Sequence, residues 1–369
     1  MSMINNYLNF FLYLIILFPQ PNHDSNYKYT VFVNKEPNCL FLHGSRGQEA
    51  KQPGAITNQL VTYIKVKHIN PNLWGNMKLY TKCKKIYYNL SDTLHKPWDE
   101  PVITKTYYNF AIGCRQVDRN GECRQWLPIS DRPNKVFTHS MGTLILASFC
   151  QSHPKECKVF QDAKRKKVSW YNVQGPLTGT PIADQVDTWC RQKNGINYLL
   201  ARYYEACEYL NGELRTTINN RSLKPSYKSY FASGMLANTA YHYLSGGICG
   251  NSAWGSSLMA SSETFDQGIW GIKLNYLWAA ATLDNYGKCL QSIDLSKTEN
   301  DGFIPTNSCL GKHRAKFNSS YQSPFYLAQS NHIEGTASTP DNLLCSLGIS
   351  QAYCTRLWYR ERTRSVNIQ

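Results

Sequence analysis

Apolar and β-branched runs recur along the chain, and each of them ends in a segment that contains glycine or polar residues. Six such runs predict strands: Tyr29–Val33, Cys39–Leu42, Lys85–Tyr88, Lys135–Thr138, Val168–Gln174 and Pro324–Ala328. Helical or irregular sequence fills the intervals, and Thr143–Phe149 is interpreted as a helix. This alternation predicts an α/β fold with a mainly parallel sheet.

The stretch between Gly175 and Asp301 is too long for a single crossover helix. It contains two predicted helices, around Tyr198–Leu210 and Leu274–Leu283. Residues 234–261 are rich in Gly, Ser and Ala and are predicted to be irregular. We therefore expect one α/β domain over residues 23–369, with a cap inserted at about residues 176–290.

The N-terminal segment contains the continuous apolar run Asn9–Phe18, followed by Pro19 and Pro21. The run fits the apolar region of a signal peptide and is shorter than the ~20 residues that a spanning helix needs. Residues 1–22 are predicted to be removed on secretion. No Lys or Arg precedes the run, so an uncleaved anchor is the alternative.

The 13 cysteines all follow this segment, and none belongs to a CxxC motif or to a Cys/His cluster with zinc-ligand spacing. Disulfides are the natural interpretation, and an odd count leaves one thiol over. Short separations favour four pairs: Cys114–Cys123, Cys150–Cys157, Cys190–Cys207 and Cys345–Cys354. Glycosylation sequons at Asn89, Asn220 and Asn318 also agree with a secreted or secretory-pathway protein.

The chain has 369 residues, of which 42% are hydrophobic and 18% charged, and so it can bury a sizeable core. Its net charge of +15 favours anionic surfaces, with basic runs at Lys164–Lys167 and Arg356–Arg364. No nucleic-acid-binding motif accompanies these runs, so nucleic acid is not an expected partner. A solvated basic face is the simpler interpretation, and an anionic membrane surface is the alternative.

The segment Val136–Leu144 (VFTHSMGTL) leads from an apolar strand through Ser140 and Gly142 into a helix. This pattern predicts a nucleophile elbow, in which a strained turn exposes the serine Oγ at a helix N-terminus. Thr138 stands where such elbows usually have their first glycine. A serine that only caps the helix is the alternative.

Acyl transfer also needs donors for the oxyanion that develops at the carbonyl. His43, Gly44 and Ser45 directly follow the strand Cys39–Leu42. The backbone N–H groups of Met141 and Ser45 are predicted to form the oxyanion hole, while His43 and Gly44 shape the loop. An ordinary turn at the end of a strand is the alternative.

The acid and the base should follow the serine in the order Asp and then His, on loops after later strands. Asp301, in the turn NDGFIP, is the predicted acid, with Asp294 and Glu299 as rivals. His332 follows the last predicted strand and is preferred as the base to His313, which lies in a polar stretch without a preceding strand. His139 is expected to point away from the site and to be structural.

With these residues in place, the chain from about Cys39 to Gly335 resembles the lipase/esterase branch of the α/β-hydrolases, particularly secreted lipase-like proteins of unicellular eukaryotes. Three further segments are similar to that group: Gln174–Asp184 (QGPLTGTPIAD), Cys249–Ser252 (CGNS) and Asn300–Pro305 (NDGFIP). The resemblance implies helices on both faces of the sheet and hydrolysis of carboxylic esters, often of lipids, without a cofactor or metal.

The same sequence features are compatible with other functions. A hydrolase-fold binding protein would keep the sheet without turnover, and the same triad also serves thioesterases and peptidases. Large apolar residues in the predicted cap either form its own core or line an acyl pocket and a lipid interface: Trp254, Trp270, Tyr276, Leu277 and Trp278.

Overall fold

The computed structural model describes residues 36–45, 60–62, 74, 77–89, 93, 95–161, 168–193, 195, 198, 201, 206–255, 284, 286–289, 291–292, 299–337 and 341–364, to which all structural statements below refer. Several predictions lie outside these residues: the signal segment 1–22, the strand Tyr29–Val33, the basic run Lys164–Lys167, the helix Leu274–Leu283, Asp294, and the cap residues Trp270, Tyr276, Leu277 and Trp278.

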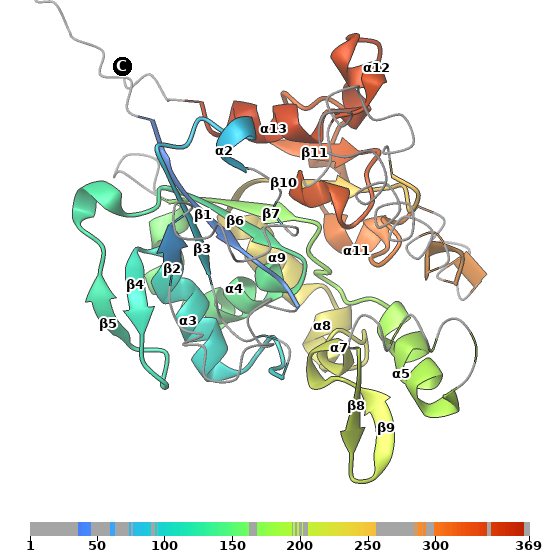
Figure 1. Ribbon diagram of the computed structural model, residues 1–369. Helices are drawn as coiled ribbons and strands as arrows, with labels where there is room; N and C mark the ends of the chain where they lie inside the picture. The colour runs from blue at the N-terminus through green and yellow to red at the C-terminus, as the bar shows by residue number, and fades with distance from the viewer. Residues whose placement is uncertain are drawn as a thin grey trace, which may run out of the picture. The chain divides into compact units, whose positions relative to one another are not determined.

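A seven-stranded sheet forms the centre of the fold, in the order β11-β10-β7-β6-β1-β3-β2 (Figure 1). Its strands are β1 (Asn38–Leu42), β2 (Leu60–Thr62), β3 (Lys85–Asn89), β6 (Lys135–His139), β7 (Ser169–Val173), β10 (Leu244–Gly250) and β11 (Phe325–Ala328). All neighbouring strands are parallel except β2 and β3. The predicted mainly parallel sheet is confirmed, as are the five predicted strands that lie within the described residues.

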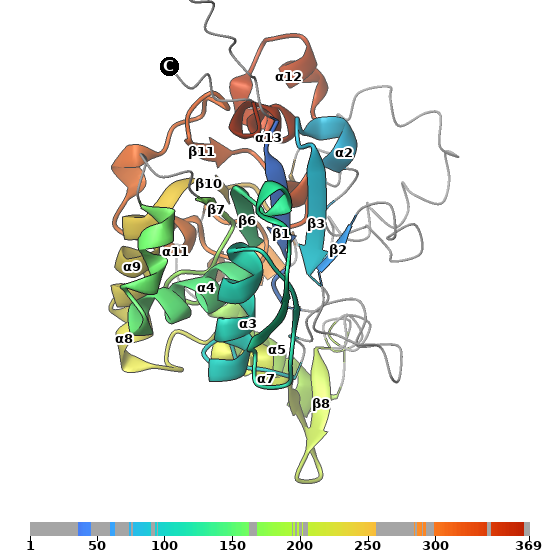
Figure 2. The ribbon, with the colours of Figure 1, turned by 90° about the vertical axis from the view of Figure 1, so that its left-hand side faces the viewer.

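Helices cover both faces of this sheet (Figure 2). The described helices are α2 (Met77–Tyr80), α3 (Pro101–Ala111), α4 (Met141–Ser152), α5 (Ile182–Gln192), α7 (Ile218–Ser222), α8 (Ser229–Ala232), α9 (Met235–Tyr243), α11 (Thr306–Leu310), α12 (Leu343–Ser346) and α13 (Thr355–Arg362). Two antiparallel pairs lie outside the sheet: β4 (Cys114–Val117) with β5 (Cys123–Trp126), and β8 (Cys207–Leu210) with β9 (Glu213–Thr216).

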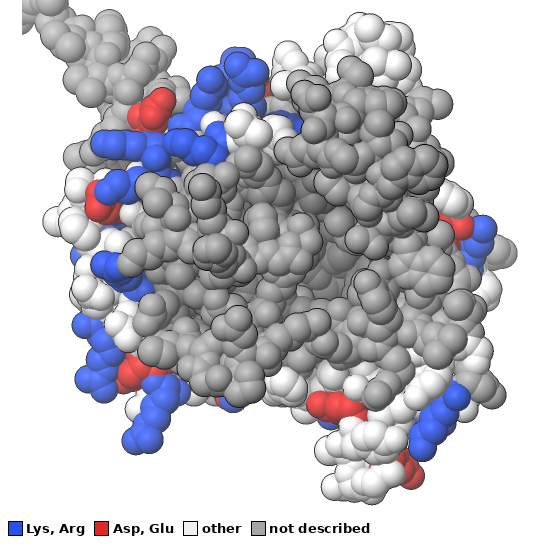
Figure 3. Space-filling model, in the orientation of Figure 1, with Lys and Arg blue, Asp and Glu red and all other residues white. Residues whose placement is uncertain are grey.

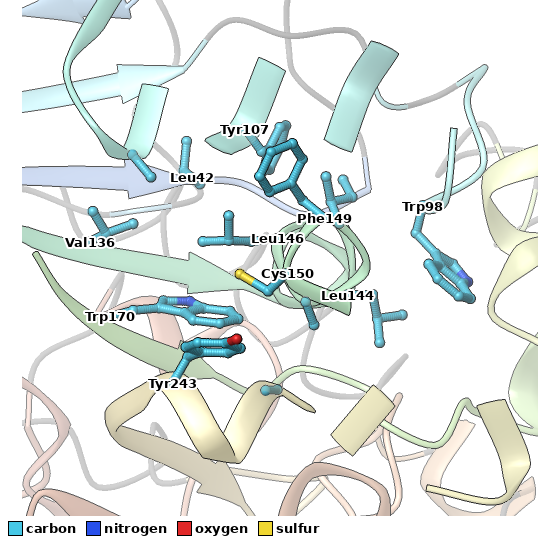
Figure 4. Close-up of a cluster of buried hydrophobic side chains, with 14 of the residues drawn as sticks. Leu42, Trp98, Tyr107, Val136, Leu144, Leu146, Phe149, Cys150, Trp170 and Tyr243 are labelled. Carbon is cyan, nitrogen blue, oxygen red and sulfur yellow. The ribbon is translucent and has the colours of Figure 1, made fainter. Parts of the chain in front are cut away.

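Side-chain alternation along the strands divides the core between the two faces. On β1, Leu40 and Leu42 belong to the cluster formed with α3, α4 and α9, part of which Figure 4 shows around Trp170 and Leu146. Cys39 and Phe41 belong to the opposite cluster, which α13 closes with Trp358 and Tyr359. Because successive side chains of a strand point to opposite faces, one strongly apolar strand supplies both clusters.

The prediction that residues 234–261 are irregular is wrong for residues 235–250, which form α9 and the sheet strand β10. Residues 256–261 lie outside the described residues. The glycines of β10 fit the close approach of its neighbours: a Cβ at Gly247 would lie 3.1 Å from the Asn172 carbonyl oxygen of β7. A composition typical of loops thus forms a buried inner strand of the sheet. The chain between β7 and β11 therefore consists of two segments, one before β10 and one after it.

The predicted helix Tyr198–Leu210 is also wrong at its C-terminal end, where Cys207–Leu210 form β8. The Asn211-Gly212 pair that follows has positive φ angles of 51° and 83° at its two residues. This is the backbone that a two-residue hairpin turn requires, and Asn-Gly is its strongest sequence signal. The turn chemistry therefore overrides the helical pattern in front of it.

The arginine-rich run Arg356–Arg364 forms most of α13 and makes contacts within the chain. The Arg356 guanidinium lies 3.7 Å from the centre of the Tyr80 ring, and Arg364 pairs with Glu361 at 2.8 Å. On the face drawn in Figure 3, Lys and Arg side chains lie around the edge with Asp and Glu among them. Part of the positive charge therefore serves packing within the fold.

Six disulfides link twelve of the cysteines, including all four predicted pairs. The other two, Cys39–Cys83 and Cys249–Cys309, have sequence separations of 44 and 60 residues. Six disulfides are the pattern of an extracellular or secretory-pathway protein. In the part of the chain that is described, no helix is long and apolar enough to cross a membrane.

The disulfide pattern makes a prediction about thiols and stability. Cys289 is the one cysteine without a disulfide partner, so the denatured, unreduced protein is expected to react with one thiol equivalent per chain. Replacing both Cys249 and Cys309 with serine should lower the free energy of unfolding by about 2–5 kcal/mol. Cys289→Ser is the control and should change it little. More than one free thiol in the native protein would contradict this pairing.

The three sequons differ in exposure. Asn89 and Asn220 are buried, with 4% and 8% of their surface exposed, whereas Asn318 is exposed. The folded chain therefore presents the Asn318 sequon to solvent and encloses the other two.

Candidate active site

Ser140 lies at the turn between β6 and α4, with φ 53° and ψ −130°. Few residues other than glycine adopt a positive φ, and such strain is concentrated at functional sites. The turn is fixed by the Ser140 N–H, which donates to the Val173 carbonyl of β7 at 2.9 Å. Gly142 is needed because a Cβ there would lie 2.5 Å from the His43 carbonyl oxygen.

Thr138 fits in place of the usual glycine because its side chain joins a buried hydrogen-bond network. Its hydroxyl accepts from the Trp170 indole N–H at 2.8 Å and lies 2.9 Å from the Thr143 hydroxyl. The Thr143 hydroxyl in turn lies 2.9 Å from Asn172 Oδ1. The elbow therefore keeps its backbone geometry with a polar anchor below the turn.

The structure brings Ser140, His332 and Asp301 together in one hydrogen-bonded chain. His332 Nε2 lies 3.0 Å from Ser140 Oγ, and His332 Nδ1 lies 2.8 Å from Asp301 Oδ2. Because a carboxylate only accepts hydrogen bonds, Nδ1 carries the proton and Nε2 is left to accept from the serine hydroxyl. This is the arrangement that a general base requires.

Asp301 is held by the turn in which it lies. Its Oδ1 accepts the backbone N–H groups of Phe303 and Ile304 at 3.0 and 2.7 Å, and its side chain is 2% exposed. Its own carbonyl accepts the His332 N–H at 2.9 Å. One oxygen of the carboxylate is thus occupied by the turn, while the other faces the imidazole.

The other candidates do not join this chain. Glu299 is half-exposed and pairs with Arg314 at 3.1 Å, and Asp294 lies outside the described residues. The His313 ring stacks on Tyr241, with 4.2 Å between the ring centres, and burial lowers its pKa.

The predicted oxyanion loop lies directly against the elbow. A Cβ at Gly44 would lie 2.6 Å from Ser140 Cβ and 2.9 Å from the Met141 nitrogen, so only glycine fits here. Ser45 is the next residue, and the side-chain amide of Asn219 donates to its Oγ. The loop of His43, Gly44 and Ser45 and the N-terminus of α4 therefore meet beside Ser140.

Several residues that hold this loop were not predicted from the sequence. The Tyr107 hydroxyl donates to the His43 carbonyl at 2.8 Å, and the Thr93 hydroxyl donates to the Gly44 carbonyl at 2.6 Å. The His43 N–H donates to Asn89 Oδ1 at 3.0 Å. Asn89 ends β3 on the strand next to β1, so a polar residue at a strand end was the only signal available.

The expectation that His139 points away from the site is wrong. The centre of its ring lies 4.7 Å from that of His332, and its Nε2 lies 3.1 Å from the His332 carbonyl oxygen. Strand alternation places His139 on the same face as Phe137, and the His332 loop crosses that face. Burial and the neighbouring His332 hold the pKa of His139 well below its usual value, so its imidazole is neutral at pH 7.

No group of three or more His, Cys, Asp or Glu side chains is placed to hold a metal ion within the described ranges.

A mainly parallel sheet with helices on both faces and a serine elbow between β6 and α4 is an α/β-hydrolase fold.

The chain matches no protein-family model and no curated protein sequence. Solved structures similar to it include the Bacillus licheniformis lipase BlEst2 in mature form, at 12% identity and a TM-score of 0.43, covering 85% of this chain and 90% of that one. The metagenomic carboxyl esterase MGS0156 is 14% identical, with a TM-score of 0.45 and coverage of 93% and 78%. Lipase 1 from Pelosinus fermentans is 12% identical, with a TM-score of 0.39 and coverage of 90% and 99%. These similarities are weak, so the function proposed below rests on the geometry of the site.

Proposed function

We propose that the protein is a secreted serine hydrolase that cleaves carboxylic esters through a covalent acyl-enzyme. The observation that carries this proposal is the hydrogen-bonded chain from Ser140 through His332 to Asp301, at an elbow with a positive φ at the serine. A serine that only caps a helix needs neither the strained backbone nor the imidazole and carboxylate behind it.

The reaction follows from the positions of these atoms. Ser140 Oγ attacks the ester carbonyl carbon while His332 Nε2 takes the hydroxyl proton, and Asp301 stabilises the resulting imidazolium. The negative charge on the carbonyl oxygen is stabilised by the backbone N–H groups of Met141 and Ser45. His332 then protonates the leaving alcohol, and the same steps with water release the acid and restore the serine.

An active enzyme is favoured over a binding protein because hydrogen bonds link Ser140, His332 and Asp301 in the order that catalysis requires. Thioesterases and peptidases use the same triad. Whether the protein cleaves an ester, a thioester or a peptide bond therefore depends on the leaving group that the site accepts. Secretion is supported by the six disulfides and by the predicted signal segment at residues 1–22.

Lipid esters are the proposed substrates, with the segments of residues 176–290 on either side of β10 supplying a cap around the acyl chain. An anionic membrane surface is the proposed place of action. Of the large apolar residues assigned to the cap, Trp254 lies within the described part of the chain and is 42% exposed. An exposed tryptophan is suited to an acyl chain or to a membrane interface.

A panel of nitrophenyl esters of increasing chain length tests both parts of this proposal, ester hydrolysis and action on lipid esters at an interface. We expect hydrolysis of short soluble esters with ordinary saturation, and a rise in the rate on long-chain esters once they aggregate. The rise should be larger with anionic lipid at low salt, because salt shortens the reach of charges to about 10 Å at 0.1 M. Equal concentration dependence for short and long esters, with no effect of salt, would leave a soluble esterase and remove the lipid interface from the proposal.

A further inference from the structure

Gln174 has a left-handed backbone conformation, which is unfavourable for a residue that carries a Cβ. It directly follows β7, has φ 51°, and is completely buried. A left-handed φ is common for glycine and disfavoured for a residue with a Cβ, so such a residue is kept where its side chain has a task.

The side chain of Gln174 reaches the segment that carries His332. Its Nε2 donates to the Asn331 carbonyl at 2.8 Å, and this acceptor fixes which way the amide faces. Asn331 is the residue immediately before His332.

Two further contacts hold the backbone of His332 itself. Its N–H donates to the Asp301 carbonyl, and its carbonyl oxygen lies 3.1 Å from His139 Nε2. The peptide groups on both sides of His332 are therefore tied to the ends of β6 and β7 and to the Asp301 turn. Within the described part of the chain, the imidazole forms hydrogen bonds with Asp301 and Ser140, so its position depends on this backbone.

The space around the Gln174 amide is shaped by glycines. A Cβ at Gly250 would lie 2.5 Å from Gln174 Nε2 and 2.8 Å from Asp301 Cβ. Gly335, three residues after His332, also packs against the amide. The buried amide is therefore closely packed between the loops that carry Asp301 and His332.

We propose that Gln174 is a positioning residue, which acts through Asn331 to hold His332 Nε2 within hydrogen-bonding distance of Ser140 Oγ. This inference rests on the proposed function, because it assigns His332 as the base. A displacement of about 1 Å at a reacting group can cost about 10²-fold in rate, so a single anchor of the base is enough to change catalysis.

Gln174→Met keeps the length of the side chain and removes the donor. The control is Asn38→Leu. Asn38 begins β1, at the amino ends of the strands, whereas the site lies at their carboxyl ends. Asn38 is also buried, its Nδ2 donates to the Ser130 carbonyl at 2.9 Å, and its Oδ1, like Oε1 of Gln174, has no partner among the described residues. Both variants should lose thermal stability, because each removes a buried amide from a carbonyl.

Only Gln174→Met should slow the chemistry. We expect its kcat for a short-chain nitrophenyl ester, and its rate of labelling by a fluorophosphonate, to fall by about 10- to 10²-fold, with KM within about twofold of wild type. Asn38→Leu should keep both rates. If Gln174→Met slows labelling no more than Asn38→Leu does, the proposal is overturned.

A second measurement does not depend on turnover. The Nδ1 proton of His332, shared with Asp301, should give a low-field NMR signal in wild type that broadens or disappears in Gln174→Met and persists in Asn38→Leu. An unchanged signal in Gln174→Met overturns the positioning role. A signal that disappears, in a protein whose wild type does not react with the probe, supports the positioning role and contradicts the ester hydrolase.

Gln174→Glu serves if the methionine variant does not fold. A protonated carboxyl can donate to the Asn331 carbonyl as the amide does, whereas an ionised one repels it. The rate relative to wild type should therefore be highest at acid pH and fall as pH rises through the pKa of the new carboxyl. A constant ratio from about pH 5 to about pH 9, a range that spans even a buried Glu, overturns the proposal.

Discussion

Replacing Ser140 with alanine is expected to remove almost all ester hydrolysis while leaving the fold intact. The loss should be on the order of 10⁶-fold in kcat, as when the nucleophile of a serine protease is removed, because no acyl-enzyme can form. The change is small and local: the side chain is 5% exposed, and His332 Nε2 is its hydrogen-bond partner. Steady-state hydrolysis of a short ester and labelling by a fluorophosphonate measure it.

Ser152→Ala is the matched control for this variant. Ser152 lies at the other end of α4 and donates to the Ser148 carbonyl at 3.2 Å, so its loss should leave labelling at the wild-type rate. A Ser140→Ala protein that is still labelled at that rate would show that another residue is the nucleophile.

Asp301→Asn is expected to lower kcat by about 10⁴-fold with little change in structure. The amide oxygen of an asparagine can still accept the backbone N–H groups of Phe303 and Ile304, as Asp301 Oδ1 does. Its NH₂ group would then face His332 Nδ1 and require that nitrogen to accept. The proton would move to Nε2, where it faces Ser140 Oγ and prevents the imidazole from acting as a base.

Glu299→Gln separates this effect from a general loss of negative charge. Glu299 precedes the same turn, is half-exposed, and pairs with Arg314 at the surface, where an ion pair contributes little. It should retain activity within about twofold of wild type. If both variants lost activity equally, the assignment of Asp301 as the acid would have to be withdrawn.

The sequence by itself determined the parts of this protein that have local signals. Continuous apolar runs predicted the strands that carry the site, because a strand buried on both faces has no polar alternation. The strand, Ser140 and Gly142 together predicted the elbow, and the order of Ser140, Asp301 and His332 predicted three residues that the fold brings within hydrogen-bonding distance. Cysteines close in sequence predicted four of the six disulfides.

Only the tertiary structure decided the features that depend on close neighbours from distant parts of the chain. In the sequence, the glycines of β10 are typical of a loop. In the folded sheet, they allow the neighbouring strands β7 and β11 to approach β10 closely. Cys249 and Cys309 pair across 60 residues, a contact for which the sequence has no local signal.

The same reason explains what the sequence missed around the base. Gln174 and His139 end neighbouring strands, and nothing in their sequence surroundings refers to His332, which lies more than 150 residues further along the chain. Their contacts arise because parallel strands bring their carboxyl ends to one edge of the sheet, where the loops after β6, β7 and β11 must pack together. The sequence specifies which residues carry the chemistry, and the packing of these loops decides which residues hold them in place.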